Sequence, residues 1–305
     1  MNSKSIDYSL LVLLALLWGS SFTMIKVALE DFHPAWIVQT RLVVGGIILL
    51  ISCIVLKKNF PTEPKKYLEL LFQGCLQGAI PFLLISYSEQ HIDSGLAGLL
   101  NTTPPMVVFI ISVFILRTKP FDIYKLIGLL LGLTGVYTAS SVTAGVLTEK
   151  YILSIIYSLL AAFSYGVGAI YGARFVKLPP LVTASSSLCL GALALMPYTL
   201  IFAGSIEAAP SVTSILALLG LSVFSTALAS VIFFRLVNNL GPLTTTSNAY
   251  LRALFSIFLG SIILSEDVNL HIIIGAVLIF LGIYFITGNG FRNAVDSMVL
   301  RGKSD

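Results

Sequence analysis

Charged residues are scarce in this chain. They make up only 10% of its 305 residues, whereas hydrophobic residues make up 57% and the mean hydropathy is +0.96. Soluble proteins carry about a quarter charged residues, so this composition excludes an ordinary soluble domain. The sequence also lacks long linkers and low-complexity tracts. We therefore predict an integral membrane protein whose main partner is the lipid bilayer, with no nucleic-acid partner.

The motifs of several other protein classes are also missing. The cysteines Cys53, Cys75 and Cys189 lie in apolar stretches without metal-ligand spacing, so we interpret them as buried packing thiols. We predict no metal and no cofactor. No His-Glu-x-x-His pattern or deep aspartate pair is present, so an intramembrane enzyme is the weaker alternative and we predict that the chain is not an enzyme. No signal-peptide cleavage site follows the first apolar stretch, which we expect to be retained.

Apolar stretches of membrane-spanning length are what the chain has in abundance. Runs of roughly 17–25 apolar residues cross the hydrocarbon core as helices. Ten such stretches are present: 9–29, 35–56, 67–88, 94–116, 122–139, 151–171, 181–203, 211–234, 243–265 and 270–288. The predicted fold class is an all-α membrane protein with ten transmembrane helices.

Basic residues are distributed unevenly between the two sides that ten spans create. With a cytoplasmic N-terminus, the inner segments hold fourteen of the eighteen Lys and Arg residues, and the outer segments are mainly acidic. The fourteen are Lys4, Lys57, Lys58, Lys65, Lys66, Arg117, Lys119, Lys125, Arg174, Lys177, Arg235, Arg292, Arg301 and Lys303. By the positive-inside rule we predict that both termini are cytoplasmic, in a bacterial inner (plasma) membrane.

The second half of the chain repeats the spacing of the first. Matching intervals run from Pro34 to Gly45 and Pro180 to Gly191, and from Gly128 to Gly135 and Gly275 to Gly282. Five spans per copy is an odd number, so the second copy is inverted, as in secondary transporters whose site lies between the repeats. We predict one repeat in residues 1–140, a second in 150–290 and a cytoplasmic tail in 291–305.

The fourth span contains a feature that is costly in lipid. Asn101-Thr102-Thr103-Pro104-Pro105 lies near its middle. A proline removes a backbone donor and bends or breaks a helix, and freed backbone groups are tolerated at this depth only against protein or a watery cavity. We assign Pro104 and Pro105 a gating or structural role. The side chains of Asn101, Thr102 and Thr103 either satisfy the bent backbone or bind a solute, and both alternatives stay open.

Arg252 is the strongest candidate for a binding residue. It lies about nine residues into the ninth span, which is ~14 Å deep at 1.5 Å per residue. A charge at that depth costs at least about 2.5 kcal/mol, so the side chain must face an interior. It either meets a solute carboxylate or pairs with a carboxylate or helix-end carbonyls of the protein. Asn248 shares its helical face, and Tyr250 offers an aromatic ring.

Further cavity-lining candidates lie at mid-span positions of other helices. Trp18 and Ser20 belong to a run of small and aromatic residues in the first span. Gln77 lies in the third span, and Tyr165 occupies in the sixth span the position that Trp18 has in the first. We predict all four as substrate-binding residues.

Three ionisable residues nearer the outer side receive gating or structural roles. Arg41 either pairs with Glu89 or Glu30 or contacts the solute. Lys26 is expected to extend its side chain to the outer surface. Because no carboxylate lies deep in a span, facilitated diffusion, exchange and proton antiport all stay open.

Several motifs, in a consistent order, resemble those of one transporter family. They are Trp18-Gly19-Ser20-Ser21-Phe22 with Lys26 and Arg41, Ser94-Gly95-Leu96-Ala97 through Asn101–Pro105, Ala229–Arg235, and Tyr250-Leu251 through Gly260 and Leu264-Ser265-Glu266. Together they cover roughly residues 9–288, and they resemble the EamA family of the drug/metabolite transporter superfamily. The resemblance implies a ten-helix inverted repeat with a central cavity, transport of small metabolites, export of amino acids by many relatives, and a homodimer in some members.

Two positions depart from the family pattern. Ala253 stands where the ninth helix usually carries a proline, which predicts a straighter ninth helix. Arg117-Thr118 replaces a Gly-Glu pair at the end of the fourth helix, which removes an acidic contact on the inner side.

We therefore predict a secondary transporter that moves a small polar metabolite by alternating access. The favoured small-molecule substrate is an amino acid or a related carboxylate-bearing metabolite, and export is favoured over import. In this hypothesis Arg252 anchors the anionic group, and Trp18, Tyr165 and Tyr250 form aromatic walls. The competing interpretation is a scaffold or receptor without transport, but such a protein needs neither the repeat nor a costly polar break.

Overall fold

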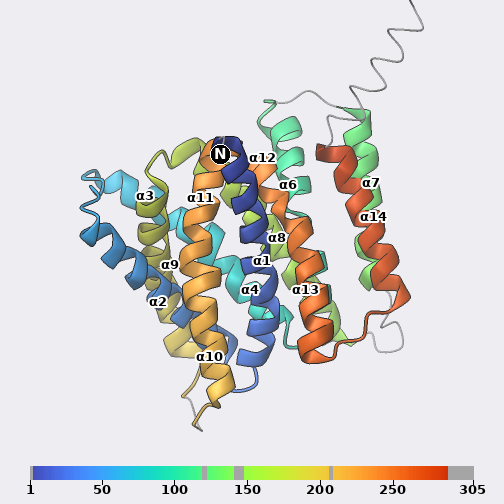
Figure 1. Ribbon diagram of the computed structural model, residues 1–305, viewed down its shortest axis with the longest axis horizontal. Helices are drawn as coiled ribbons and strands as arrows, with labels where there is room; N and C mark the ends of the chain where they lie inside the picture. Colours follow the sequence, from blue (N-terminus) through green and yellow to red (C-terminus); the bar gives the residue numbers. More distant parts are fainter. Residues whose placement is uncertain (1–2, 119–121, 141–147, 206–208, 288–305) are drawn as a thin grey trace, which may run out of the picture.

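Helices form all the regular structure that can be described. The computed structural model describes residues 3–118, 122–140, 148–205 and 209–287, and within these ranges no strand is present (Figure 1). Eight helical spans are long and apolar enough to cross a membrane, and two shorter apolar helices lie at Leu126–Ala139 and Leu270–Gly282. The predicted tail at 291–305 lies outside the described residues.

Six rods of the bundle are continuous and four are interrupted. The continuous ones are α1 (Ser3–Ala28), α2 (Pro34–Val55), α7 (Ile123–Ser140), α8 (Glu149–Phe175), α9 (Pro180–Phe202) and α14 (Leu270–Thr287). The third span consists of α3 (Pro64–Gly74), the π-helix η1 (Cys75–Ala79) and α4 (Ile80–Ser88), and the fourth of α5 (Ser94–Leu100), α6 (Pro104–Ile110) and the π-helix η2 (Ile111–Ile115). The eighth span consists of α10 (Val212–Gly220), the π-helix η4 (Leu221–Leu228) and α11 (Ala229–Leu240). The ninth consists of α12 (Pro242–Thr246) and α13 (Asn248–Leu264).

These bounds agree with the predicted stretches to within a few residues at most ends. The eighth span is the main exception, because α11 continues to Leu240 rather than to residue 234. It ends at Gly241, whose φ of +81° suits a residue without a Cβ, and Pro242 then opens α12. The longer helix places Arg235 on α11 instead of in a loop.

The ninth span consists of two helices, α12 and α13, and the straighter helix expected from Ala253 stays a prediction. A one-residue interruption at Ser247 separates α12 from α13 although no proline lies there. The side chains of Thr246, Ser247 and Asn248 each donate a hydrogen bond to the backbone carbonyl three residues earlier. Such bonds compete with the helical ladder, so local polar side chains produce the interruption.

The outside of the bundle is apolar and its interior is rich in polar groups. Large side chains such as Val55, Leu200, Ile201, Phe258 and Ile262 are exposed. In contrast, many serines and threonines and two arginines are buried. This distribution suits a bilayer, where the surroundings are as apolar as the side chains that face them. In Figure 1, α1 begins and α14 ends at the same end of the bundle, as an even number of crossings requires.

Close helix packing depends on glycines. The helices α7 and α14 form the most extensive pair in the described part of the chain. A Cβ on Gly135 would collide with the Gly275 carbonyl and the Ile279 backbone. Likewise, a Cβ on Gly74 of α3 would collide with the Ser187 carbonyl of α9. Small residues at these contacts let the backbones approach, as is usual between helices in membranes.

Candidate functional site

The two prolines of the fourth span leave two backbone carbonyls without their helical donors. In an α-helix, Leu100 and Asn101 would accept from the N–H groups of residues 104 and 105, but Pro104 and Pro105 have none. The Thr103 hydroxyl donates to the Leu100 carbonyl at 3.3 Å. The Asn101 carbonyl is taken by a residue far away in the sequence, Arg252. The break therefore provides the acceptor that holds a buried guanidinium.

Arg252 is buried in the middle of the bundle, with 3% of its surface exposed. Its Nη2 donates both to the backbone carbonyl of Asn101 and, at 2.9 Å, to the Asn101 Oδ1. No carboxylate of the described residues lies within ion-pair distance of the guanidinium. The Arg252 Nε–H has no hydrogen-bond partner there either. A buried cation therefore keeps one donor available for a ligand.

Aromatic rings surround this guanidinium. Its central carbon lies 5.6 Å from the Trp18 ring, 5.8 Å from the Phe22 ring and 5.7 Å from the Tyr165 ring. Ring faces attract a cation, and more strongly when water is excluded. Phe233 packs against Trp18 with ring centroids 5.4 Å apart.

The π-helical segments fix two residues of this wall. Trp18 Nε1 donates to the Ser225 carbonyl in η4 at 3.1 Å. In the same way, the Ser164 hydroxyl, next to Tyr165 in the chain, donates to the Leu76 carbonyl in η1 at 2.8 Å. A π segment disturbs the regular α-helical ladder and is common at functional sites. The segments η1 and η4 each accept a hydrogen bond from the helix that carries a cavity aromatic.

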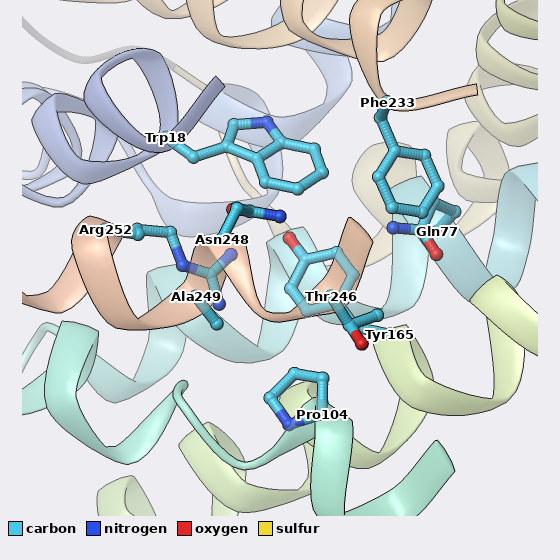
Figure 2. Close-up of a pocket in the computed structure, with 9 residues that line it drawn as sticks. All are labelled: Trp18, Gln77, Pro104, Tyr165, Phe233, Thr246, Asn248, Ala249 and Arg252. Atoms are coloured by element: carbon cyan, nitrogen blue, oxygen red, sulfur yellow. The ribbon is translucent and has the colours of Figure 1, made fainter. Parts of the chain in front are cut away.

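Nine residues line a small cavity beside Arg252 (Figure 2). They are Trp18, Gln77, Pro104, Tyr165, Phe233, Thr246, Asn248, Ala249 and Arg252. Trp18 lies on one side of the guanidinium and Pro104 lies on the opposite side (Figure 2). The enclosed space is about that of one water molecule. A metabolite therefore fits only after the helices move apart.

The cavity combines one unpaired donor with two unpaired acceptors. Gln77 Oε1 and Asn248 Oδ1 are buried and accept no hydrogen bond from the described residues, while Arg252 Nε donates none. A carboxylate is the natural partner of a guanidinium N–H, and amide oxygens accept from an ammonium group. Unpaired buried polar groups are costly in an empty site. The cavity is thus complementary to a small molecule that carries both groups.

Most of the residues predicted from the sequence meet at this site, and several do not. Arg252, Trp18, Gln77, Tyr165 and Asn248 line the cavity together, and Asn101 holds Arg252. The hydroxyls of Thr102, Thr103 and Ser20 instead donate to backbone carbonyls of their own turns.

Tyr250 does not line this cavity, although its hydroxyl is buried and has no partner in the described residues. Phe233, Thr246 and Ala249 were not anticipated. Phe233 and Ala249 look like ordinary apolar span residues, and Thr246 is distinguished only by its place before the interruption at Ser247. No signal in the sequence separates Phe233 from its neighbour Phe234.

Arg41 lies in a second buried site. Its exposed fraction is 1%, and its Nε donates to Thr226 Oγ1 at 3.1 Å. The guanidinium lies 4.1 Å from the centre of the Phe82 ring. No carboxylate of the described residues is within ion-pair distance, so of the two alternatives for Arg41 the pairing with Glu89 or Glu30 is not found there. The interior therefore contains two arginines without a carboxylate in contact.

The end of the bundle predicted to face outward, the outer end, holds contacts between charged side chains and helix ends. Lys26 is partly buried, and its Nζ donates to the carbonyls of Glu89 at 2.7 Å and Ile92 at 2.8 Å, at the end of the bundle toward which it was expected to extend. The Glu266 carboxylate accepts from the N–H groups of Ser94 at 2.7 Å and Gly95 at 2.9 Å. Each contact places a charge at the helix end of opposite polarity.

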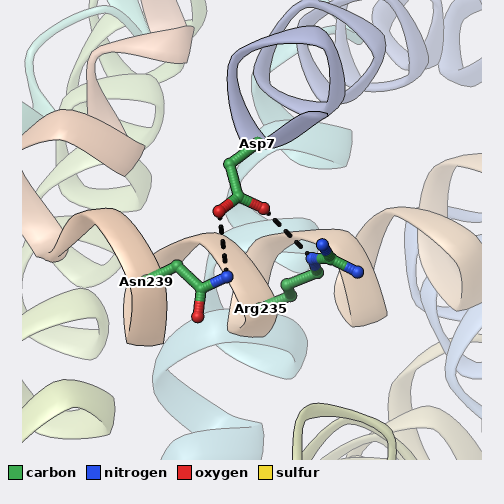
Figure 3. A network of polar contacts seen from close by, with 3 residues as sticks. All are labelled: Asp7, Arg235 and Asn239. Carbon is green, nitrogen blue, oxygen red and sulfur yellow. Dashed lines mark hydrogen bonds and ion pairs between the residues drawn. The ribbon is translucent and has the colours of Figure 1, made fainter. Parts of the chain in front are cut away.

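The opposite end, predicted to face the cytoplasm and called the inner end, holds an ion pair between α1 and α11 (Figure 3). Asp7 is 3% exposed and accepts from Arg235 Nε at 3.1 Å and from Asn239 Nδ2 at 3.0 Å. These contacts join α1 to α11 at this end of the bundle.

Asp7→Ala is expected to loosen the inner end at a modest cost in stability. The Arg235 side chain is 44% exposed, and such pairs contribute about 1 kcal/mol or less. Thermal unfolding at low and high salt measures the loss, which should shrink at high salt. Glu69→Ala is the control, because it breaks the Lys66 ion pair within a single helix. An equal and salt-independent loss in both variants would contradict the inner-end role.

A model of the EamA-like transporter family matches the chain twice, over residues 6–141 and 152–288. The two matches together cover most of the sequence and divide it near the predicted boundary between the two repeats.

Relatives and solved structures agree with the family match. An uncharacterized transporter of Bacillus subtilis, YoaV, is 24% identical over 93% of this chain and 98% of its own length. An uncharacterized inner membrane transporter of Escherichia coli, YedA, is 25% identical over 83% of this chain and 81% of its own. One crystal structure superposes with a TM-score of 0.69 at 16% identity, covering 94% of this chain and 98% of that one, so the two share a fold.

Proposed function

Because the chain belongs to the EamA-like transporter family, we propose that it carries amino acids or related carboxylate-bearing metabolites across the inner membrane. That the chain is a multi-pass membrane transporter follows from the family and the apolar helices. The class of solute, the direction of transport and the alternating-access mechanism form the proposal. Export is the expected direction, as the family resemblance implies.

One observation supports the choice of solute above all others. Arg252 Nε is an unpaired donor on a buried cation, and Gln77 Oε1 and Asn248 Oδ1 are unpaired acceptors in the same cavity. An amino acid supplies a carboxylate for Arg252 Nε and an ammonium group for the two amide oxygens. The rings of Trp18, Tyr165 and Phe233 then cover its side chain, and binding removes the cost of three unsatisfied polar groups.

The proposed mechanism is alternating access between two inverted five-helix repeats. Helix contacts support the repeat: α1 packs on α13 as α8 packs on α5 and α6, and the repeat-related pairs α2 with α9 and α7 with α14 face each other. The third and eighth spans each contain a π segment before their last part. We place both termini in the cytoplasm, because the predicted inner segments carry most of the basic residues.

The test compares three versions of each solute. Purified protein is heated with L-leucine, L-threonine or L-phenylalanine, with the primary amide of each, and with the acid that lacks the amino group. A ligand that binds only the folded state raises the melting temperature. We expect the amino acids to raise it most, the deaminated acids less and the amides least, because an amide has no negative charge to pair with the Arg252 guanidinium.

Counterflow of the stabilising amino acids in proteoliposomes then separates transport from binding. Amides that stabilise as well as the amino acids would contradict the carboxylate assignment. Binding without flux would favour a receptor over a transporter.

A further inference from the structure

Glu89 has no role in the binding site, yet its side chain is completely buried. It directly follows α4, the last part of the third span, and its exposed fraction is 0%. Neither carboxyl oxygen has a hydrogen-bond partner among the described residues. A buried carboxylate without hydrogen bonds is strongly disfavoured. These surroundings therefore stabilise the protonated, neutral form of the group.

The charges that face Glu89 come from three elements. On α1, Lys26 uses its ammonium group for the backbone carbonyls of Glu89 and Ile92. On α2, Arg41 interacts with Glu89 only at longer range, because it is bonded to Thr226. After α13, Glu266 adds a like charge. None of these groups forms an ion pair with the Glu89 carboxyl at contact distance.

The helix α8, which packs along α4, adds hydroxyl groups beside the end of that helix. Ser158 Oγ is 2.7 Å from Ser88 Oγ, and the Tyr157 ring packs against the Tyr87 ring with centroids 6.3 Å apart. In the same loop as Glu89 lies the exposed Asp93, and desolvation and the charge of Glu266 raise the pKa of its carboxyl. Residues of α1, α2 and α8 and of the segment after α13 therefore surround Glu89.

The energetic consequences agree with the geometry. Burial raises the pKa of the Glu89 carboxyl well above its ordinary value, and the negative charge of Glu266 raises it further, while Lys26 and Arg41 act against the rise. The position also lies at the C-terminal end of α4, where the helix dipole disfavours an anion.

We propose that Glu89 is a proton-binding site of the transporter, and that the proton bound there holds the outer end of the bundle closed. A charged Glu89 is stable only in contact with water, and water reaches it only when the Lys26 contacts to the Glu89 and Ile92 carbonyls separate. Loss of the proton and opening of the outer end are therefore linked, and each favours the other. An acidic exterior closes the outer end, and an alkaline exterior opens it.

The first test detects the proton directly. Infrared spectra of the purified protein at about pH 7 should contain the carbonyl absorption of a protonated carboxyl group. Glu89→Gln should remove this band, and Glu89→Asp should shift it without removing it. Glu30→Gln is the matched control, because Glu30 is an exposed carboxyl at the same end of the bundle. A wild-type spectrum without the band, or a band that survives in Glu89→Gln, would overturn the proton site.

The second test follows thermal stability against pH. The folded state keeps the Glu89 proton, while the unfolded chain releases it above the ordinary value of 4.5. Stability should therefore fall as pH rises from that value toward the raised folded pKa, by up to tenfold in the unfolding equilibrium per pH unit. This fall should be smaller in Glu89→Gln and unchanged in Glu30→Gln. Identical slopes in all three proteins would contradict the proposal.

The third test measures closure of the outer end. Ile92→Cys places a thiol at a residue that is 3% exposed and whose carbonyl binds Lys26. Its labelling by an impermeant maleimide is compared in the Glu89 and Glu89→Gln backgrounds at each pH, so that thiol ionisation cancels. The ratio of labelling in the Glu89 background to labelling in the Glu89→Gln background should be near one in acid and should rise at least severalfold in alkali. A constant ratio would overturn the closure, and because no solute is present these tests do not depend on the proposed substrate.

Discussion

Arg252→Ala is expected to abolish the stabilisation by amino acids and most of their flux. Hydrogen bonds to charged groups contribute about 1.5–3 kcal/mol, which corresponds to roughly a tenfold to hundredfold loss of affinity. The amides, which have no negative charge to pair with the guanidinium, should be affected little. Thermal-shift titrations and counterflow with the same solutes measure both effects.

The folded state should survive this substitution. Arg252→Ala leaves the Asn101 carbonyl without its donor, but it also removes a charge whose burial is costly. Arg252→Lys separates charge from geometry, because lysine keeps the charge but not the planar fork of N–H groups, and intermediate affinity is expected. Arg174→Ala, at an exposed position of α8, is the control. Wild-type affinity in a folded Arg252→Ala protein would refute the anchoring role.

Trp18→Ala should cause the largest loss of stability among the cavity residues. The side chain is 7% exposed, packs against Tyr165 and Phe233, and donates to the Ser225 carbonyl. Truncation of a buried aromatic to alanine costs about 3–5 kcal/mol, and here it also leaves a carbonyl of η4 unpaired. Thermal unfolding measures the loss.

A milder variant and a second tryptophan sharpen this test. Trp18→Phe keeps an aromatic face over Arg252 but loses the hydrogen bond, about 1 kcal/mol, and part of the buried ring, so a loss smaller than that of Trp18→Ala is expected with solute binding largely kept. Trp36→Ala is the control, because Trp36 also donates from Nε1 to a carbonyl, that of Gly204, but in an exposed place. Equal losses at Trp18 and Trp36 would show that the cavity packing contributes little.

The central contact of the site could be anticipated because polar groups are so costly in lipid. Two prolines and a charge at membrane depth each require a partner, and the repeat placed the break at Asn101 and the charge at Arg252 in corresponding helices. That reasoning left open whether Arg252 meets a solute or helix-end carbonyls. The structure shows the bond to the Asn101 carbonyl and also an unpaired Nε, so one guanidinium combines a structural contact with a free donor.

Other features depend on helix rotation and on local backbone geometry, which periodicity does not determine. Ser20 and Tyr250 are close in sequence to cavity residues but belong to other faces of their helices. The π segments change the rotation of everything after them, so the orientation of Phe233, five residues beyond η4, could not be derived from spacing. The carbonyls that bind Lys26 become available only where α4 ends, so these contacts could not be derived from spacing.

We expect the two buried arginines also to make transport sensitive to membrane voltage. Their charges belong to the protein and have no carboxylate in contact, so the empty interior carries net positive charge in the electric field. Moving one elementary charge across 100 mV takes about 2.3 kcal/mol. An amino acid with no net charge leaves the net positive charge of the interior unchanged, whereas an anionic metabolite offsets it. We therefore expect currents recorded from planar bilayers to distinguish these two solutes, with the return of the empty transporter as the voltage-sensitive step.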